Sequence, residues 1–135
     1  MNTFAPHILI VDDDAGIREA LRDWFEKCNH CTAVAASCSD EAFEHLRKGR
    51  FDAVITGVNQ LEMDGLEMTA VIRRMGGPPV IVMTGHYFPE VRRQAYISGA
   101  KAFLRKPFLL ERLAQAVYAV AWHGLHFVGP VETNS

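Results

Sequence analysis

Short apolar runs alternate with segments of helical period along most of this chain, and no other feature limits its fold so strongly. The runs cover residues 7–11, 32–36, 51–56, 80–83 and 102–104. Continuous apolar runs of this kind are typical of strands that are covered on both faces. Strands that alternate with helices predict an α/β fold, in which right-handed crossovers give a doubly wound parallel sheet.

Apolar residues repeat at helical spacing between these runs. The spacing i, i+3, i+4, i+7, i+8 and i+11 is shared by Ile17, Ala20, Leu21, Trp24, Phe25 and Cys28. These positions lie on one face of a helix, where Trp24 and Phe25 are expected in the core. Further helices are expected at 39–49, 66–75, 89–97 and 109–122. Ser39 is the expected N-cap of the first of these four, because acids follow it in the first turn.

The charge balance excludes some classes of partner. The 135 residues carry 14 Lys and Arg against 16 Asp and Glu, for a net charge of −2. This balance gives no electrostatic reason to expect nucleic acid or an anionic membrane as a partner. No stretch approaches the ~20 apolar residues that span a bilayer, and the first residues do not resemble a signal peptide. We therefore expect a cytoplasmic protein.

Three cysteines, an odd number, do not form a disulfide framework. Cys28, His30 and Cys31 resemble half of a zinc site, but no second pair has matching spacing, so structural zinc is disfavoured. Residues 7–122 are expected to form one domain. Residues 123–135 are expected to be a flexible C-terminal tail, and the chain is either a protein that acts alone or a fragment of a longer one.

Polar residues follow the predicted strands where parallel strands place their functional sites. Asp12 and Asp13 follow the first strand, with Asp14 as the expected cap of the next helix. Thr84 follows the fourth strand and Lys106 the fifth. Clustered carboxylates favour Mg²⁺, and a hydroxyl with a lysine supplies donors for a phosphoryl group. The pattern therefore predicts a site that handles phosphoryl groups.

Several motifs, taken in order, resemble the receiver domain of two-component response regulators over residues 7 to about 122. They are Ile8–Asp14, Met63-Asp64-Gly65, Val80–Gly85, Gly99-Ala100-Lys101 and Lys106-Pro107-Phe108. The resemblance implies a flavodoxin-like (βα)5 fold with strand order 2-1-3-4-5. It also implies an acidic pair for Mg²⁺ at Asp12 and Asp13, with the backbone carbonyl of Asn59 as a further ligand.

The same resemblance assigns Thr84 and Lys106 to the phosphoryl pocket and Thr84 and Phe103 to the conformational switch. It implies a cis peptide bond between Lys106 and Pro107. It also implies a sensor histidine kinase or another signalling protein as partner. The last helix is unusually apolar, so a homodimer through the fourth and fifth helices and the fifth strand is a further expectation.

The chain departs from the family at the residue that would accept the phosphoryl group. The family places an aspartate there, seven residues before Asp64, and this chain has Gly57. Leu61 replaces the usual proline nearby. A glycine forms no acyl phosphate and supplies no carboxylate to Mg²⁺, so Mg²⁺ binding is expected to be weak. Asp52 stands at the far end of the same strand, roughly 16 Å away at ~3.3 Å per residue, and does not substitute.

Three kinds of function remain open at this point. The first is a receiver that is not an enzyme and works as a phosphorylation-independent interaction module, either natural or engineered from an active receiver. The second is a Mg²⁺-dependent phosphatase of the haloacid dehalogenase type, with Asp12 as nucleophile and Asp14 as general acid. The third, an FMN-binding flavodoxin, lacks a hydroxyl-rich phosphate loop after the first strand.

Overall fold

The computed structural model describes residues 5–28, 30–58, 63–85 and 89–126. Within these residues, five parallel strands form one sheet in the order β2-β1-β3-β4-β5. The strands are β1 (His7–Val11), β2 (Thr32–Ala36), β3 (Ala53–Gly57), β4 (Val80–Thr84) and β5 (Ala102–Arg105). The helices are α1 (Ala15–Cys28), α2 (Ser39–Lys48), α3 (Gly65–Arg74), α4 (Pro89–Ser98) and α5 (Leu110–His126). This arrangement confirms the predicted flavodoxin-like α/β fold and its strand order.

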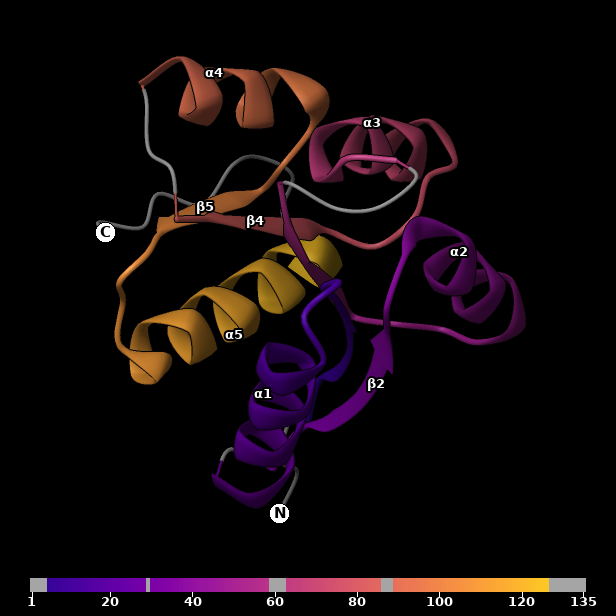
Figure 1. Ribbon diagram of the computed structural model, residues 1–135. Coiled ribbons are helices and arrows are strands. Elements are labelled where there is room, and N and C mark those ends of the chain that lie inside the picture. Colours follow the sequence, from indigo (N-terminus) through magenta and orange to yellow (C-terminus); the bar gives the residue numbers. More distant parts are fainter. Residues whose placement is uncertain (1–4, 29, 59–62, 86–88, 127–135) are drawn as a thin grey trace.

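Helices cover both faces of the sheet. Figure 1 shows α1 and α5 on one face and α2, α3 and α4 on the other. Side chains alternate between the faces along each strand. On β1, Ile8 and Ile10 therefore pack with α1 and α5, whereas Leu9 and Val11 pack toward α2, α3 and α4. All four of these side chains are fully buried, which explains why the strands appear as unbroken apolar runs.

The predicted face of α1 packs against the sheet except at Ala20, which is exposed. Phe25 is fully buried, and Trp24 is half-buried with its ring edge-on to Phe25 at a centroid distance of 5.2 Å. The prediction that both residues belong to the core is confirmed. The side chain of Cys28 lies outside the described part of the structure.

Helix α2 begins differently from the prediction. Cys38, with extended backbone, is the N-cap, and Ser39 is the first helical residue and is buried. No side chain caps this end, but the Glu41 carboxylate accepts hydrogen bonds from the Ser37 backbone N–H at 2.6 Å and the Ser37 hydroxyl at 2.9 Å. Glu41, in the first turn of α2, thus accepts from Ser37 just ahead of the helix. This hydrogen bonding stabilises the start of α2 without a capping side chain at Ser39.

Helix α5 continues to His126, beyond the predicted end at Trp122. Most of its apolar side chains lie against the sheet, and Leu113, Ala116, Val117 and Val120 are almost fully buried. Trp122 is 54% exposed, and Leu109, just before the helix, is 72% exposed. The surplus of apolar residues on this helix is therefore mostly covered. Residues 127–135 of the expected tail lie outside the described residues.

The sequence predicted no membrane-spanning segment and disfavoured a structural zinc site. In the described part of the chain, no helix has the length and apolar character needed to cross a membrane. Cys31 is buried with its Sγ 3.9 Å from the Tyr118 hydroxyl, and Cys38 is half-buried. Neither belongs to a group of three potential metal ligands among the described residues.

Candidate functional site

The strand register brings the predicted site residues to one edge of the sheet. Val11 pairs with Thr56, so Asp12 and Gly57 are the next residues at neighbouring strand ends. Gly57 pairs with Met83, and Thr84 pairs with Arg105. The ends of β1, β3, β4 and β5 therefore meet, as the alternation of strands and helices predicted.

Asp12 is the acid that the fold holds most firmly. Its carboxylate Oδ1 accepts a hydrogen bond from the Asp14 backbone N–H at 2.8 Å, and its carbonyl accepts one from the Arg18 guanidinium at 2.8 Å. The side chain is only 6% exposed. Burial raises the pKa of Asp12, the Asp14 N–H and the Lys106 ammonium act in the opposite direction, and the carboxylates of Asp13 and Asp14 add to the rise. A cation next to this carboxylate would relieve its desolvation and repulsion.

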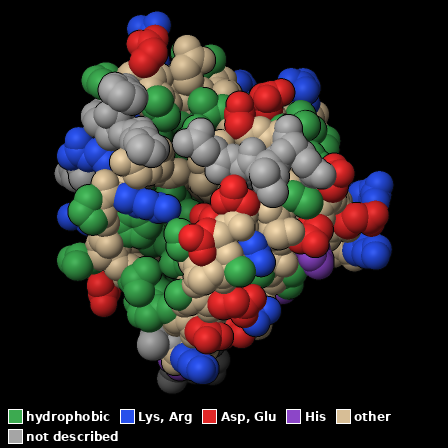
Figure 2. Space-filling model, in the orientation of Figure 1, with side chains coloured by type: hydrophobic (Ala, Val, Ile, Leu, Met, Phe, Trp, Pro, Cys, Tyr) green, Lys and Arg blue, Asp and Glu red, His purple; other side chains and the backbone are tan. Residues whose placement is uncertain are grey.

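Asp13 and Asp14, the other two acids after β1, differ in what they contact. Asp14 Oδ1 accepts a hydrogen bond from the Ile17 N–H at 3.1 Å, so Asp14 caps α1 as predicted. Asp13 is exposed at the same edge. Figure 2 shows acidic side chains gathered near the middle of this face, above α1. Asp12 and Asp13 remain the pair available to a cation.

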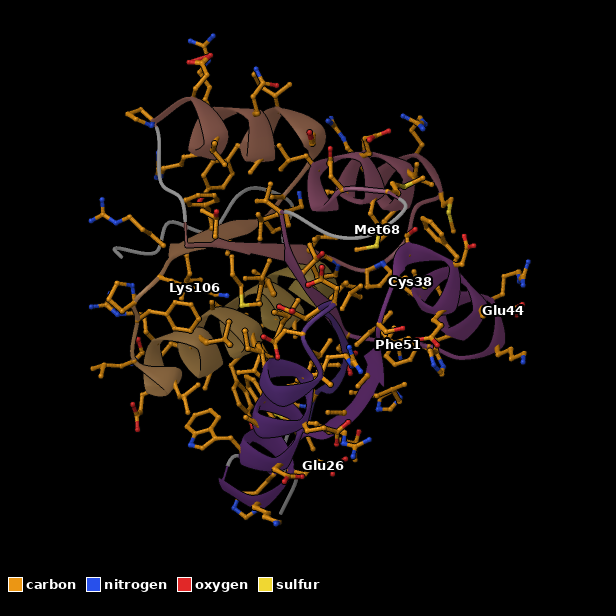
Figure 3. The ribbon with its side chains drawn as sticks, viewed as in Figure 1. Glu26, Cys38, Glu44, Phe51, Met68 and Lys106 are labelled. Carbon is orange, nitrogen blue, oxygen red and sulfur yellow. The ribbon has the colours of Figure 1, made fainter. Side chains whose placement is uncertain are left out.

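Thr84 and Lys106 meet from β4 and from the turn after β5. The Lys106 N–H donates to the Thr84 carbonyl at 2.8 Å, and the Lys106–Pro107 peptide bond is cis, as expected. The Lys106 side chain is half-buried and extends toward the ends of the central strands (Figure 3). Its positive charge lowers the pKa of Asp12, against the larger effect of burial.

Phe103 and Thr84 lie on the same face of the sheet. Phe103 pairs with Val82, and Thr84 is two residues beyond Val82 on the same strand. Residues two apart on a strand share a face, and Phe103 and Val82 belong to the core under α2, α3 and α4. Both predicted switch residues are almost fully buried. A change at Thr84 can therefore reach Phe103 through a shared packing layer.

Gly57 ends β3 at the centre of the site and carries no side chain. Asp64, at the start of the next helix, caps α3: its Oδ1 accepts from the N–H groups of Leu66 and Glu67 at 2.9 Å. The Gly65 N–H also donates to the Val58 carbonyl at 2.8 Å. Asn59, the predicted source of a carbonyl ligand, and Leu61 lie outside the described residues.

The residues present fit Mg²⁺ only in part. Hard oxygen ligands suit this ion, and Asp12 and Asp13 supply two carboxylates. No group of three His, Cys, Asp or Glu side chains capable of holding a metal occurs among the described residues. Asp12, Thr84 and Lys106 belong to the same edge of the sheet as Gly57, and Gly57 supplies no nucleophile there.

Arg18 is a site residue that the sequence did not reveal. It stands one turn after Asp14 on an exposed stretch of α1, where a charged side chain is typical of a solvated helix face. Only the structure shows its guanidinium on the Asp12 carbonyl.

Comparisons with known proteins agree on one family. The model of the response regulator receiver domain matches residues 8–118. Response regulator MprA of Mycobacterium ulcerans is 35% identical over 114 residues, which are 84% of this chain and 49% of that protein. Heme response regulator HssR of Staphylococcus saprophyticus is 30% identical over 112 residues, or 83% of this chain and 50% of that protein. The chain thus spans about half the length of these curated relatives.

Solved structures of receiver domains and a chemotaxis protein are also similar to this chain. The chemotaxis protein CheY4 of Vibrio cholerae is 28% identical with a TM-score of 0.79, and the match covers 87% of this chain and 99% of that one. The receiver domain of Francisella response regulator 1452 has a TM-score of 0.82 at 24% identity, covering 87% of this chain and 98% of that one. The second likeness supports the fold alone.

Proposed function

Because the chain belongs to the response regulator receiver domain family, we propose that it serves two-component signalling as a receiver without a phosphate-accepting aspartate. One observation carries the proposal: Gly57 is the last residue of β3, at the edge where Asp12, Thr84 and Lys106 meet. An acyl phosphate needs a carboxylate, and glycine has none. The domain then works as a phosphorylation-independent interaction module and not as an enzyme.

Neighbouring carboxylates are poorly suited to replace the missing one. Asp12 is buried and its Oδ1 is already hydrogen-bonded to the Asp14 N–H. Asp52 lies before β3, at the other end of that strand, where its Oδ2 accepts from the His7 N–H at 2.8 Å. In-line phosphoryl transfer requires tight positioning of the nucleophile, which neither carboxylate provides.

Weak Mg²⁺ binding is part of the proposal. Asp12 and Asp13 would hold the ion, with the carbonyl of Asn59 as the third protein ligand. When bound, the ion would neutralise the acidic pair and relieve the repulsion between its carboxylates. The absent carboxylate at position 57 is the reason to expect weak affinity.

The phosphatase and flavin-binding alternatives lose their basis once the family is known. The phosphatase interpretation also needs Asp14 as a general acid, whereas Asp14 is exposed and caps α1. Failure to hydrolyse a generic phosphate ester is the result that we expect.

A natural receiver without its aspartate and an engineered one have the same described site. The natural version is favoured because Leu61 is atypical as well, and a change made only to silence the protein would not need it. In both versions the partner is a sensor histidine kinase or another signalling protein.

A homodimer through α4, β5 and α5 is the oligomer that we propose. Ile97 at the end of α4 is 59% exposed, and Leu109 ahead of α5 is 72% exposed. Glu90 and Arg93 on α4 are exposed and form an ion pair at 3.5 Å within the helix, and a self-complementary interface could exchange these partners between the two copies. Light scattering of the wild type and of Leu109→Glu tests this, and equal masses at every concentration would exclude the interface.

Amide NMR with Mg²⁺ and beryllofluoride, a mimic of the phosphoryl group, tests the proposed function. The wild type should show no shifts at Thr84 and Phe103, whereas Gly57→Asp should show both. Gly57→Asn is the matched control, because it adds a side chain of the same size without the charge. Gly57 does not have a positive φ, so its backbone conformation does not require a glycine. Beryllofluoride-dependent shifts in the wild type would contradict the proposal.

A further inference from the structure

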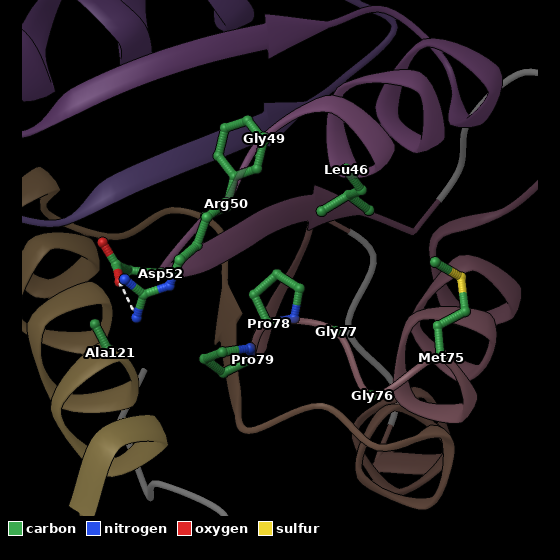
Figure 4. Close-up of a pocket in the computed structure, with 11 residues that line it drawn as sticks. Leu46, Gly49, Arg50, Asp52, Met75, Gly76, Gly77, Pro78, Pro79 and Ala121 are labelled. Atoms are coloured by element: carbon green, nitrogen blue, oxygen red, sulfur yellow. Dashed lines mark ion pairs between the residues drawn. The ribbon is translucent and has the colours of Figure 1, made fainter.

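A cavity lies at the opposite end of the sheet from Asp12 and Gly57. Its volume is about 390 Å³, within the range of pockets that take small ligands or single side chains. Figure 4 shows it between the ends of α2 and α3 and the C-terminal half of α5. The lining residues include Leu46, Arg50, Phe51, Asp52, Met75 and Ala121, together with the loop 76–79.

The walls of this cavity favour an apolar side chain. Leu46 is half-buried, Phe51 and Ala121 are buried, and Met75 is 54% exposed. Pro78 and Pro79 line another side and have no backbone N–H, so an added strand would find no donors there. Binding at this cavity therefore depends on side-chain packing rather than on strand pairing.

Arg50 is the polar group that the cavity offers to a ligand. Its side chain is 80% exposed, and a guanidinium nitrogen lies 3.9 Å from Asp52 Oδ1, too far for a hydrogen bond (dashed line in Figure 4). The other Asp52 oxygen accepts from the His7 N–H at 2.8 Å. Asp52 is thus committed to the fold, whereas Arg50 keeps N–H donors for a carboxylate.

The charges that surround the cavity also favour an acidic ligand. The last turns of α2 and α3 carry Arg47, Lys48 and Arg74 next in sequence to lining residues. Arg73 is not counted, because its guanidinium donates to the Ile97 carbonyl on α4. With Arg50, these cations outnumber Glu44 and Asp52 by two. The two helix C-termini contribute about half a negative charge each, which leaves an excess of roughly one positive charge.

We propose that this cavity binds an acidic peptide of a partner protein. One aliphatic or aromatic side chain enters the space between Leu46, Met75 and Ala121, and a neighbouring carboxylate binds Arg50. The cavity is a strand length away from Gly57, so a peptide bound here leaves the phosphoryl edge open to another protein. The proposal is therefore independent of the missing aspartate.

Two capped dipeptides test the chemistry directly: acetyl-Phe-Glu-amide and acetyl-Phe-Gln-amide, which differ by one carboxylate. Titrated into the full chain, the Glu peptide should shift the amides of Gly49, Gly76 and Gly77, with a dissociation constant on the order of 1 mM. The Gln peptide should bind about twofold to fivefold more weakly, as expected for one exposed ion pair. Absence of shifts at about 10 mM of the Glu peptide would overturn the proposal.

Variants separate the two halves of the site. Arg50→Gln should remove the preference for the Glu peptide, and Met75→Glu should abolish binding of both peptides. Ala20→Glu is the control, because Ala20 is exposed on α1 and does not line the cavity. Amide spectra establish that each variant is folded. A preference that survives Arg50→Gln, or equal losses in Met75→Glu and Ala20→Glu, would also overturn the proposal.

Discussion

The carbonyl oxygen of Gly57 lies 1.8 Å from the point where a Cβ atom would stand on Gly65. Real Cβ atoms never approach a backbone oxygen so closely, so α3 can begin here only with a glycine. The Asp64-Gly65 turn therefore packs directly against the backbone at the end of β3. This contact involves the backbone carbonyl of residue 57, so it does not depend on which side chain stands there.

Gly65→Ala should destabilise the fold, because the backbone of Gly57 would have to shift to admit a methyl group. We expect a loss of about 1–3 kcal/mol in the free energy of unfolding, as for other overpacked sites. Gly49→Ala is the control, since a Cβ there would meet nothing closer than 3.8 Å. Urea unfolding measures both, and equal losses would contradict the contact.

Asp12→Asn should stabilise the protein at neutral pH in the absence of Mg²⁺. The folded pKa of Asp12 is raised, mainly by burial, so the carboxyl favours folding when protonated and this contribution is lost as pH rises through that raised pKa. Asparagine keeps an acceptor for the Asp14 N–H and carries no charge. Its advantage should shrink as the pH falls through the raised pKa of Asp12 and be gone below the ordinary pKa of an aspartate.

Melting temperatures across the pH range, with a chelator present, provide the measurement for Asp12→Asn. Asp23→Asn, an exposed acid on α1, is the control and should show a much smaller effect. An advantage of Asp12→Asn that is independent of pH would show that charge is not its cause.

Asp13→Ala and Asp14→Ala should separate cation binding from helix capping. Asp14→Ala removes the cap on the Ile17 N–H and should cost about 1 kcal/mol of stability. Asp13→Ala should change stability little and weaken Mg²⁺ binding more than Asp14→Ala does. Thermal melts and Mg²⁺ titrations followed by NMR distinguish the two, and a reversed order would refute this division of roles.

Gly57→Asp should raise Mg²⁺ affinity and lower stability without Mg²⁺. A third carboxylate would stand beside Asp12, whose burial already opposes ionisation, and like charges at this spacing cost roughly 1–3 kcal/mol. Gly57→Asn should show neither effect. Unfolding curves with and without Mg²⁺ test this, and a Gly57→Asp variant whose stability does not respond to Mg²⁺ would count against a cation site.

The strands were predictable because a strand that is buried on both faces consists of consecutive apolar residues. The bounds of β1 and β2 agree with the prediction. The third run was placed at 51–56, whereas β3 covers Ala53–Gly57. Phe51 is apolar for another reason: its ring stacks on His7 at 4.5 Å, outside the strand.

The sequence predicted which residues lie at the site, but it did not predict all the contacts that they make. The order of strands implied that Asp12, Thr84 and Lys106 share an edge. The guanidinium of Arg18 on the Asp12 carbonyl and the contact of Gly65 with Gly57 depend on backbone positions that no sequence pattern encodes. The cavity near Arg50 was not foreseen either, because its walls come from segments far apart in the chain.

Hydrogen bonds from the Asp14 N–H, the Ile17 N–H and the Arg18 guanidinium hold the loop at 12–14. All three donors lie within residues 14–18, so the loop needs no bound ion or partner to keep this conformation. The acidic pair is thus ordered during folding and does not depend on residue 57 for its shape. A carboxylate introduced at position 57 would therefore meet an acidic pair whose supporting hydrogen bonds are already in place.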